Sequence, residues 1–302
     1  MDAVLRIVAR APITHHAANG EVTHAPMVVA QVNGIEARLV LDTGADVHLV
    51  TSDFADRLGL DTTPAEDGTD HGGASVKSRE LPDVMLSLGG ATFELSGVVV
   101  IPAFEAFTRM GIDGILSPQN ISGTAMAVLD MAPNELLLLD GSDEAIARWL
   151  KERSPDLRML ELERDQSEGM VVVKSAIAPN AAVPTLLDSG GKRTEFARAA
   201  VPRLAGSPAG KSERLGGGVS GGDFSGADAG AQTLVIGGQR LSVPSLAVRE
   251  EMHGPPGLVG MDVLRGTILA CAADRDRPVF LLVRAAFAAS QTSGPRDSSR
   301  RQ

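Results

Sequence analysis

Leu39-Val40-Leu41-Asp42-Thr43-Gly44-Ala45-Asp46 is an apolar strand that runs directly into a carboxylate, a small hydroxyl residue and a glycine. Upstream, residues 27–32 are rich in β-branched side chains, and Asn33-Gly34 gives the strongest short signal for a hairpin. The returning strand is alternating at first and then fully apolar, so Asp42 lies where a core begins to close. A single Asp after an apolar strand is most often a turn or a cap, so this motif alone defines no site.

A second copy of the motif occurs late in the chain, as Leu186-Leu187-Asp188-Ser189-Gly190-Gly191. It again follows two predicted strands, at residues 170–177 and 182–187. Comparable landmarks then follow each motif in one order and at near-equal spacing. Counted from Asp42 and from Asp188, they are Gly72 and Gly217 after 30 and 29 residues, Gly89 and Gly237 after 47 and 49, and Ser117 and Gly260 after 75 and 72. This predicts two similar halves; two unrelated β domains with incidental Asp-x-Gly turns are the disfavoured alternative.

The remaining pattern is predominantly that of short strands. We assign residues 1–140 to a first lobe, 141–168 to an interlobe helix and linker, 169–285 to a second lobe and 286–302 to a disordered tail. Helices are predicted at 53–59, 142–151 and 196–204, although Pro202 weakens the last, and 157–162 is either a strand or a helical turn. Further strands are predicted at 4–8, 83–88, 91–95, 98–101, 127–130, 135–139, 233–236, 239–243, 268–272 and 279–283.

The composition limits the classes of partner. The 302 residues carry a formal net charge of −10, which argues against nucleic acid and against an anionic membrane surface. No apolar run is long enough to cross a bilayer. The single cysteine, Cys271, excludes intramolecular disulfides. The first ten residues lack a basic segment followed by a long apolar one, so we expect no signal peptide, and these features together favour a cytoplasmic location.

Other chemistry-bearing residues have structural interpretations. His15-His16 has no third ligand at a metal-binding spacing, so we interpret it as a solvated loop and expect no metal and no cofactor. The glycine-rich stretch at 215–222 lacks the Gly-Lys-Ser/Thr ending of a phosphate loop and is interpreted as a flexible loop. Cys271 is expected in the core and His48 in a structural or solvated position, and Ser189 is not in a Gly-x-Ser-x-Gly context.

The two Asp motifs together suggest acid–base chemistry. Two similar lobes packed about a pseudo-twofold axis bring equivalent loops together, so Asp42 and Asp188 are expected at one site. Two carboxylates a few ångströms apart cannot both ionise easily and therefore share a proton. The charged member can take a proton from water while the protonated member donates to a carbonyl oxygen. The hydroxyls of Thr43 and Ser189 are expected to hydrogen-bond across to the opposite loop.

Glycines are expected to serve this site in two ways. Gly44 and Gly190 let backbone N–H groups approach the carboxylates with no side chain in the way. The glycine-rich stretches at matching positions in the two halves suit loops that fold over an extended substrate. The candidate flap residues are Gly72, Gly73, Gly217 and Gly218.

The motif at residues 39–46 resembles the active-site loop of aspartic proteases, and most closely that of the retropepsin branch. Residues 113–116 and 258–264 resemble that family's apolar-apolar-Gly segment. The resemblance implies a mostly β, bilobal acid-protease fold with two retropepsin-like β-barrel lobes related by a pseudo-twofold axis. It also implies hydrolysis of a peptide or protein substrate by Asp42 and Asp188, and proton sharing between two such carboxyls is established for that family. Because one chain holds both halves, we expect a monomer.

Three features of the sequence depart from the family pattern. Ser117 stands where glycine is expected, Gly191 follows the second motif where alanine is typical, and the sequence contains no tyrosine to serve as a flap tyrosine. The favoured function is therefore an aspartic endopeptidase whose flaps act through glycine backbone. The alternative is a catalytically weak or inactive protein of the same fold that binds peptides.

Overall fold

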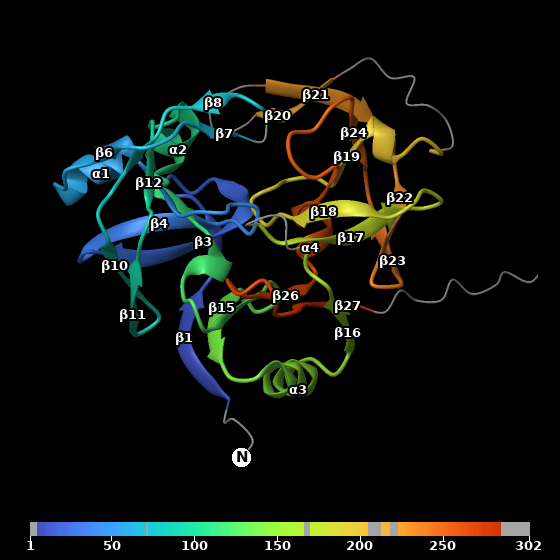
Figure 1. The fold of residues 1–302 in the computed structure, drawn as a ribbon, viewed down its shortest axis with the longest axis horizontal. Helices are drawn as coiled ribbons and strands as arrows, with labels where there is room; N and C mark the ends of the chain where they lie inside the picture. The colour runs from blue at the N-terminus through green and yellow to red at the C-terminus, as the bar shows by residue number, and fades with distance from the viewer. Residues whose placement is uncertain (1–4, 71, 166–169, 205–212, 218–222, 285–302) are drawn as a thin grey trace, which may run out of the picture.

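The computed structural model describes residues 5–70, 72–165, 170–204, 213–217 and 223–284, and within these ranges the chain is mostly β. The described strands form sheets of ten, nine and six strands and a separate two-stranded hairpin (Figure 1). None of the helices in these ranges has the length and apolar character needed to span a membrane.

The ten-stranded sheet belongs to the first half of the chain. The Asn33-Gly34 hairpin joins its two longest neighbours, and Asn33 has the positive φ that such a turn requires. In spatial order the sheet contains β11 (Ala91–Leu95), β10 (Val84–Leu88), β3 (Val22–Val32), β4 (Ile35–Leu41), β13 (Gly114–Leu116), β5 (Leu49–Thr51), β12 (Val99–Ile101), β9 (Arg79–Glu80) and β6 (Thr63–Pro64), with β2 (Thr14–His16) paired to β3.

Apart from β2, which has no counterpart in it, the nine-stranded sheet repeats this order strand for strand in the second half. Its β18 and β25 are parallel, as β4 and β13 are in the first half, and β19 is parallel to β24 as β5 is to β12. The matched order contains β23 (Gln239–Val243), β22 (Gln232–Ile236), β17 (Val172–Ile177), β18 (Val183–Leu187), β25 (Gly257–Val259), β19 (Glu195–Ala197), β24 (Ala247–Arg249), β21 (Asp223–Asp228) and β20 (Glu213–Gly217).

The six-stranded sheet, which we call the shared sheet, takes strands from both halves. Its central pair is antiparallel and joins Leu129 of one half to Leu269 of the other. Helix α3 (Asp143–Arg153) begins at the N-cap Ser142 and packs Ile146 and Leu150 against one face, below the sheet in Figure 1. The sheet contains, in order, β1 (Arg6–Pro12), β15 (Glu135–Asp140), β14 (Met126–Asp130), β26 (Ile268–Cys271), β27 (Val279–Arg284) and β16 (Leu157–Leu162).

The other helices are short. Thr51 caps α1 (Ser52–Leu58) through its hydroxyl, which accepts from Phe54 N–H at 3.3 Å. Helix α2 (Glu105–Met110) has no counterpart among the predicted elements. The 3₁₀ turn η1 (Pro118–Asn120) and helix α4 (Met261–Leu264) follow β13 and β25 at equivalent places.

Several sequence predictions are wrong in detail. Residues 196–204 do not form a helix: Phe196 lies fully buried in strand β19, which occupies the place of β5, and only the 3₁₀ turn η2 (Arg198–Ala200) follows. Pro202, which has no backbone N–H, lies where a helix would have to continue. His15 and His16 lie in strand β2 rather than in a solvated loop. The first strand covers 6–12 rather than 4–8, and residues 157–162 form a strand.

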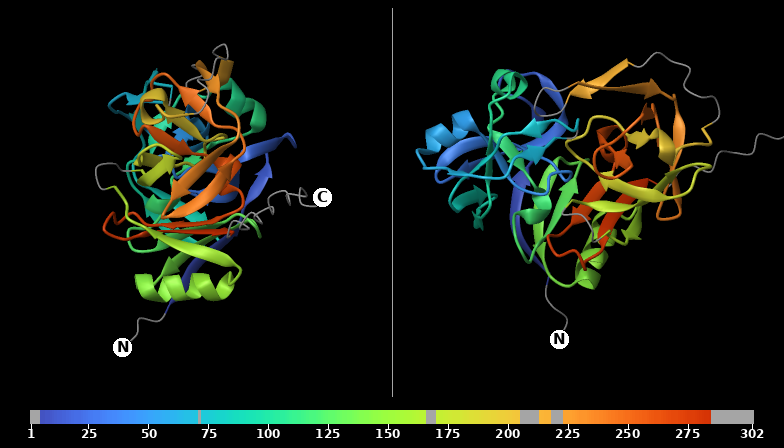
Figure 2. Two further views of the ribbon diagram at one scale, coloured as in Figure 1. Left: turned by 90° about the vertical axis from the view of Figure 1, so that its right-hand side faces the viewer. Right: turned by 45° about the horizontal axis from the view of Figure 1, so that its top comes forward.

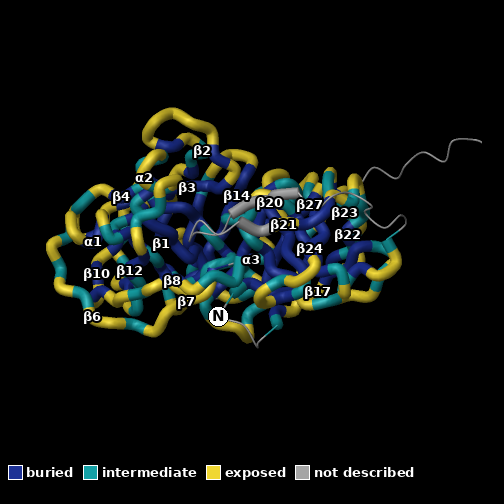
Figure 3. Tube along the Cα trace, turned by 90° about the horizontal axis from the view of Figure 1, so that it is seen from above, coloured by how far each residue is buried: buried dark blue, intermediate teal, exposed yellow. Residues whose placement is uncertain are grey.

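The apolar core is continuous across the halves. Buried residues of both large sheets and of one face of the shared sheet belong to one cluster, while the other face packs on α3. Figure 2 shows the ten-, nine- and six-stranded sheets from two further directions, and Figure 3 shows buried backbone through the middle with exposed residues at the rim. Cys271 is buried there, and burial raises the pKa of its thiol to about 12, so it is an inert core residue. The predicted tail at 286–302 lies outside the described residues.

The central pairing of the shared sheet gives a stability prediction. Leu269 is fully buried in the core cluster, so Leu269→Ala is expected to lower the free energy of unfolding by about 2–5 kcal/mol. Val29→Ala is the control, because Val29 is 43% exposed, and we expect it to cost less than about 1 kcal/mol. Urea unfolding followed by circular dichroism measures both. Equal costs would contradict the assigned core.

Candidate active site

Each Asp motif follows the end of a core strand, and the backbone of its Asp is hydrogen-bonded to the neighbouring parallel strand. Asp42 follows β4, and its N–H donates to Leu116 O of β13 at 3.0 Å. Asp188 follows β18, and its N–H donates to Val259 O of β25 at 2.9 Å. Because these strand pairs are equivalent in the two sheets, the two Asp residues follow equivalent strand ends.

Reciprocal hydrogen bonds join the two loops. Thr43 Oγ1 donates to Leu187 O at 2.6 Å, and Ser189 Oγ donates to Leu41 O at 2.7 Å. In return, Ser189 Oγ accepts from Thr43 N–H and Thr43 Oγ1 accepts from Ser189 N–H, both at 3.0 Å. Both side chains are fully buried. The bonds fix each loop to the strand end of the opposite half, as expected from the sequence.

The glycines after the hydroxyl residues lie directly against the carboxyl groups. Gly44 N–H donates to Asp42 Oδ1 and Gly190 N–H to Asp188 Oδ1, each at 2.8 Å. A Cβ on Gly44 would lie 2.8 Å from Asp188 Cγ, and one on Gly190 would lie 2.5 Å from Asp42 Oδ2. Each glycine therefore leaves the space that the carboxyl group of the opposite half occupies.

The two carboxyl groups are hydrogen-bonded to each other, which requires a proton because two carboxylates offer only acceptors. Desolvation raises the pKa of both, although each residue keeps some exposure. The pKa of Asp188 is well above the ordinary range because the charge of Asp42 adds to the desolvation. Backbone N–H groups of residues 44, 45 and 190 counteract the rise in the pKa of Asp42. The pKa of both carboxyl groups is thus raised, and the two titrate as a unit that shares a proton.

Gly191, the unusual residue of the second motif, has a structural reason. Its N–H is a second donor to Asp188 Oδ1 at 2.8 Å, and a Cβ there would lie 2.8 Å from Asp188 Oδ2. Ser117 is likewise accommodated: its Oγ donates to Ala45 O at 2.8 Å and accepts from Asn120 Nδ2 at 2.9 Å. The equivalent Gly260 cannot be serine without rearrangement, because a Cβ there would lie 2.5 Å from the carbonyl oxygen of Arg193.

His48 is hydrogen-bonded to the backbone of the segment that packs against the first loop. Its Nδ1 accepts from Ser117 N–H at 3.2 Å, so its Nε2 carries the hydrogen and donates to Asn120 O at 3.2 Å. Burial lowers its pKa, which favours this neutral form. In the second half Thr194 takes the same place, accepting from Gly260 N–H at 3.3 Å. His48 is therefore structural, one of the two options that the sequence left open.

The candidate flap residues lie on hairpins. Gly72 and Gly73 are in the turn between β7 (Gly68–Thr69) and β8 (Ser75–Val76), and a Cβ on Gly73 would lie 2.0 Å from His253 Nε2 of the second half. Gly217 ends β20, whose hairpin with β21 lies with β7 and β8 along the top of Figure 1. Gly218 lies outside the described residues.

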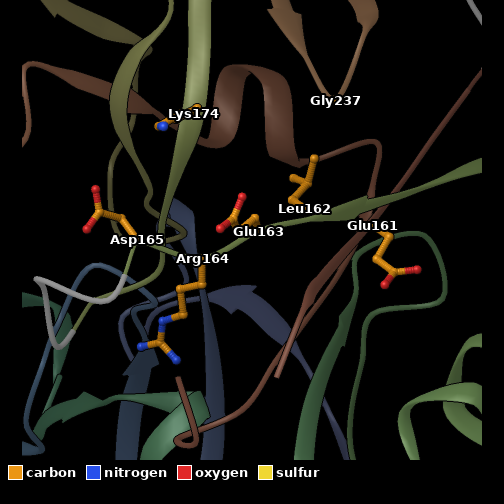
Figure 4. Close-up of a pocket in the computed structure, with 7 residues that line it drawn as sticks. All are labelled: Glu161, Leu162, Glu163, Arg164, Asp165, Lys174 and Gly237. Carbon is orange, nitrogen blue, oxygen red and sulfur yellow. The ribbon is translucent and has the colours of Figure 1, made fainter. Parts of the chain in front are cut away.

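A separate cavity of about 410 Å³ lies between β16, β17 and the turn before β23. Figure 4 shows the acidic side chains of Glu163 and Asp165 near Arg164, with Glu161 farther away in β16. Arg164 directs its guanidinium to backbone, donating to Ala272 O at 2.6 Å. The cavity includes neither Asp42 nor Asp188. Among the described residues no group of three His, Cys, Asp or Glu side chains could hold a metal ion.

Comparison with known proteins agrees with this geometry. Residues 28–118 match the model of a family described as aspartyl protease. The segment that contains Asp42 is therefore similar in sequence to aspartyl proteases. Its structure is similar to the crystal structure of an aspartic proteinase from Irpex lacteus, with a TM-score of 0.55 and 12% sequence identity, over 96% of this chain and 100% of the other. No curated protein matches the chain.

These comparisons confirm the predicted family and the predicted mostly β, bilobal fold. Sequence reasoning missed two contacts near the loops. Asn120 donates to Asp46 O at 2.8 Å, and His24 Nε2 lies 2.9 Å from Gly190 O. No local sequence pattern indicated either contact, because each joins residues that are far apart in the sequence.

The cross-half hydroxyls give a second stability prediction. Thr43→Ala leaves Leu187 O and Ser189 N–H without their partner in a buried place, so we expect a loss of about 2–4 kcal/mol in the free energy of unfolding. Thr43→Ser keeps the hydroxyl and is expected to cost about 1 kcal/mol, mainly for the lost methyl. Chemical denaturation measures both, and a similar cost for the two variants would show that the hydroxyl is unimportant.

The raised pKa of Asp188 gives a pH-dependent prediction. Its stabilising contribution is fully present below the unfolded pKa near 3.8 and is lost as pH rises through the higher folded pKa. Asp188→Asn removes this loss while keeping an oxygen acceptor for Gly190 N–H. The variant is therefore expected to have a Tm a few degrees above that of the parent at neutral pH, with the difference vanishing near pH 3.5. Calorimetry across this range measures it, and a variant less stable at neutral pH would contradict the assignment.

Proposed function

We propose that this protein is an aspartic endopeptidase, in which Asp42 and Asp188 activate water for hydrolysis of a peptide bond. The proposal rests chiefly on the hydrogen-bonded carboxyl pair, held by equivalent loops at the meeting of two halves. A proton shared within such a pair provides a general base and a general acid at one place, without a metal or a covalent intermediate.

In the proposed mechanism Asp42 takes a proton from a water molecule while the water oxygen attacks the carbonyl carbon. Asp188 donates its proton to the carbonyl oxygen, which yields a neutral diol. In the second step the carbon–nitrogen bond breaks as Asp42 returns its proton to the nitrogen. A diol hydroxyl gives its proton to Asp188 as the new acid forms, and both carboxyl groups regain their starting states.

The surroundings of the pair support this division of roles. Backbone N–H groups donate to both carboxyl groups, and the charge of Asp42 favours the protonated form of Asp188. Thr43, Gly44, Ser189 and Gly190 are proposed to position the pair, and the hairpins that contain Gly72, Gly73 and Gly217 to contact the peptide. Gly218 is proposed for the same role from the sequence alone.

Substitution of each Asp tests the mechanism. Asp42→Asn and Asp188→Asn are each expected to lower kcat/KM by at least about 10²–10⁴-fold, because each removes one partner of the proton transfer. A peptide library incubated from acidic to neutral pH, with products identified by mass spectrometry, measures cleavage. Since one carboxyl must be charged and the other protonated, the rate is expected to fall on both sides of an optimum.

Two outcomes would argue against the proposal. Cleavage that survives either substitution would exclude the shared-proton pair. Failure of the intact protein to cleave any peptide at any pH would favour the alternative, a peptide-binding protein with an inactive site. Thr43→Ser serves as the matched control, because it alters the same loop and retains both carboxyl groups.

A further inference from the structure

His24 of β3 crosses from the first half to the active-site loop of the second. Its Nε2 lies 2.9 Å from Gly190 O, and because a carbonyl oxygen only accepts, the ring nitrogen donates. Gly190 in turn lies against the carboxyl group of Asp42. His24 keeps solvent-exposed surface, although the surrounding protein partly desolvates its ring. It therefore borders the carboxyl pair on one side and remains open to a molecule passing over it.

Two cations accompany His24. Lys192 is exposed and follows Gly190 by two residues. Helix α4 starts at the same loop, because Met261 N–H donates to Gly191 O at 2.8 Å, and Arg265 lies directly beyond its end. Desolvation lowers the pKa of His24, and the charges of Lys192 and Arg265 lower it further. His24 is thus a neutral donor at neutral pH, and the fixed positive charge comes from Lys192 and Arg265.

Within the part of the chain that the structure describes, no acidic side chain pairs with Lys192 or Arg265. Arg193, next to Lys192, by contrast pairs with Asp228 at 3.1 Å. The acid with the largest influence on His24 is Asp42. Because the chain has a net charge of −10, it repels an acidic peptide overall. Attraction of such a peptide must therefore come from local positive charge.

We propose that His24, Lys192 and Arg265 form a cationic subsite beside Asp42 that receives an acidic side chain of the peptide substrate. The inference rests on the proposed function and adds a substrate class to it. Lys192 is the expected contact, because its ammonium is a compact charge on a flexible stem. Arg265 strengthens the local potential, and His24 holds the Gly190 carbonyl that forms the wall of the subsite.

Matched peptides test the subsite. Starting from a cleaved neutral sequence, each of several positions on both sides of the scissile bond is set in turn to Glu, Gln or Lys, and kcat/KM is measured. At one position Glu is expected to exceed Gln. The ratio of kcat/KM for the Glu peptide to that for the Gln peptide should fall about two- to fivefold in Lys192→Gln, which is the size expected for an exposed charge pair. Lys192→Glu should shift the preference to Lys at that same position.

Two controls separate local charge from general effects. Lys151→Gln removes an exposed lysine from α3, on the far side of the shared sheet, and should keep the Glu-to-Gln ratio of the parent. The parent ratio should also decrease between 0.1 M and 1 M salt, where the Debye length falls from about 10 Å to about 3 Å. Arg265→Gln is a second test variant if a Lys192 variant fails to fold.

The outcomes distinguish the subsite from the proposed function. Equal cleavage of Glu and Gln peptides at every position, or an unchanged Glu preference in Lys192→Glu, would overturn the subsite and leave the protease proposal standing. If no peptide is cleaved, the protease proposal fails, and the same labelled peptides are then compared for binding by fluorescence anisotropy. Equal affinity for the Glu and Gln peptides would overturn the subsite in that case as well.

Discussion

The buried hydroxyls of Thr43 and Ser189 couple the two halves at the point where their strands end. Each hydroxyl donates to a carbonyl of the opposite strand and accepts from the opposite loop, so neither loop can shift without leaving buried polar groups unpaired. This constraint also determines where the two carboxyl groups lie. Two acids that repel when ionised are kept in contact by neighbours that carry no charge.

The same constraint explains why small residues surround the site. Glycine at 44, 190 and 191 leaves room for the carboxyl groups and supplies N–H donors. The two halves need not be identical, and they differ where their backbones approach differently. Serine fits at 117 because its hydroxyl finds partners, whereas the carbonyl of Arg193 excludes a side chain at 260. The departure at Ser117 is therefore compatible with a well-packed first loop.

Much of the fold could be predicted from the sequence because strand, turn and Asp motif occur twice at matching spacing. The Asn33-Gly34 hairpin and the strands leading to Asp42 and Asp188 are set by local pattern. Strand β19 could not be recognised, because Phe196 is held by neighbouring strands rather than by local preference. Other features depend on contacts between segments that are far apart in the sequence, so no short motif reveals them. They are helix α2, the contact of His24 with the opposite half, and the hydrogen bonds of His48.

The shared sheet has a consequence for how such a chain can be divided. Strands β14 and β26 pair at its centre, each from an equivalent place in its own half. An isolated half would expose that strand as an unpaired apolar edge, which is a template for another strand of the same shape. A second copy of the half presents that shape. If the two halves were expressed as separate chains, each is therefore expected to associate with a second copy of itself as readily as with the other half. The peptide connection between the halves then mainly determines which halves pair.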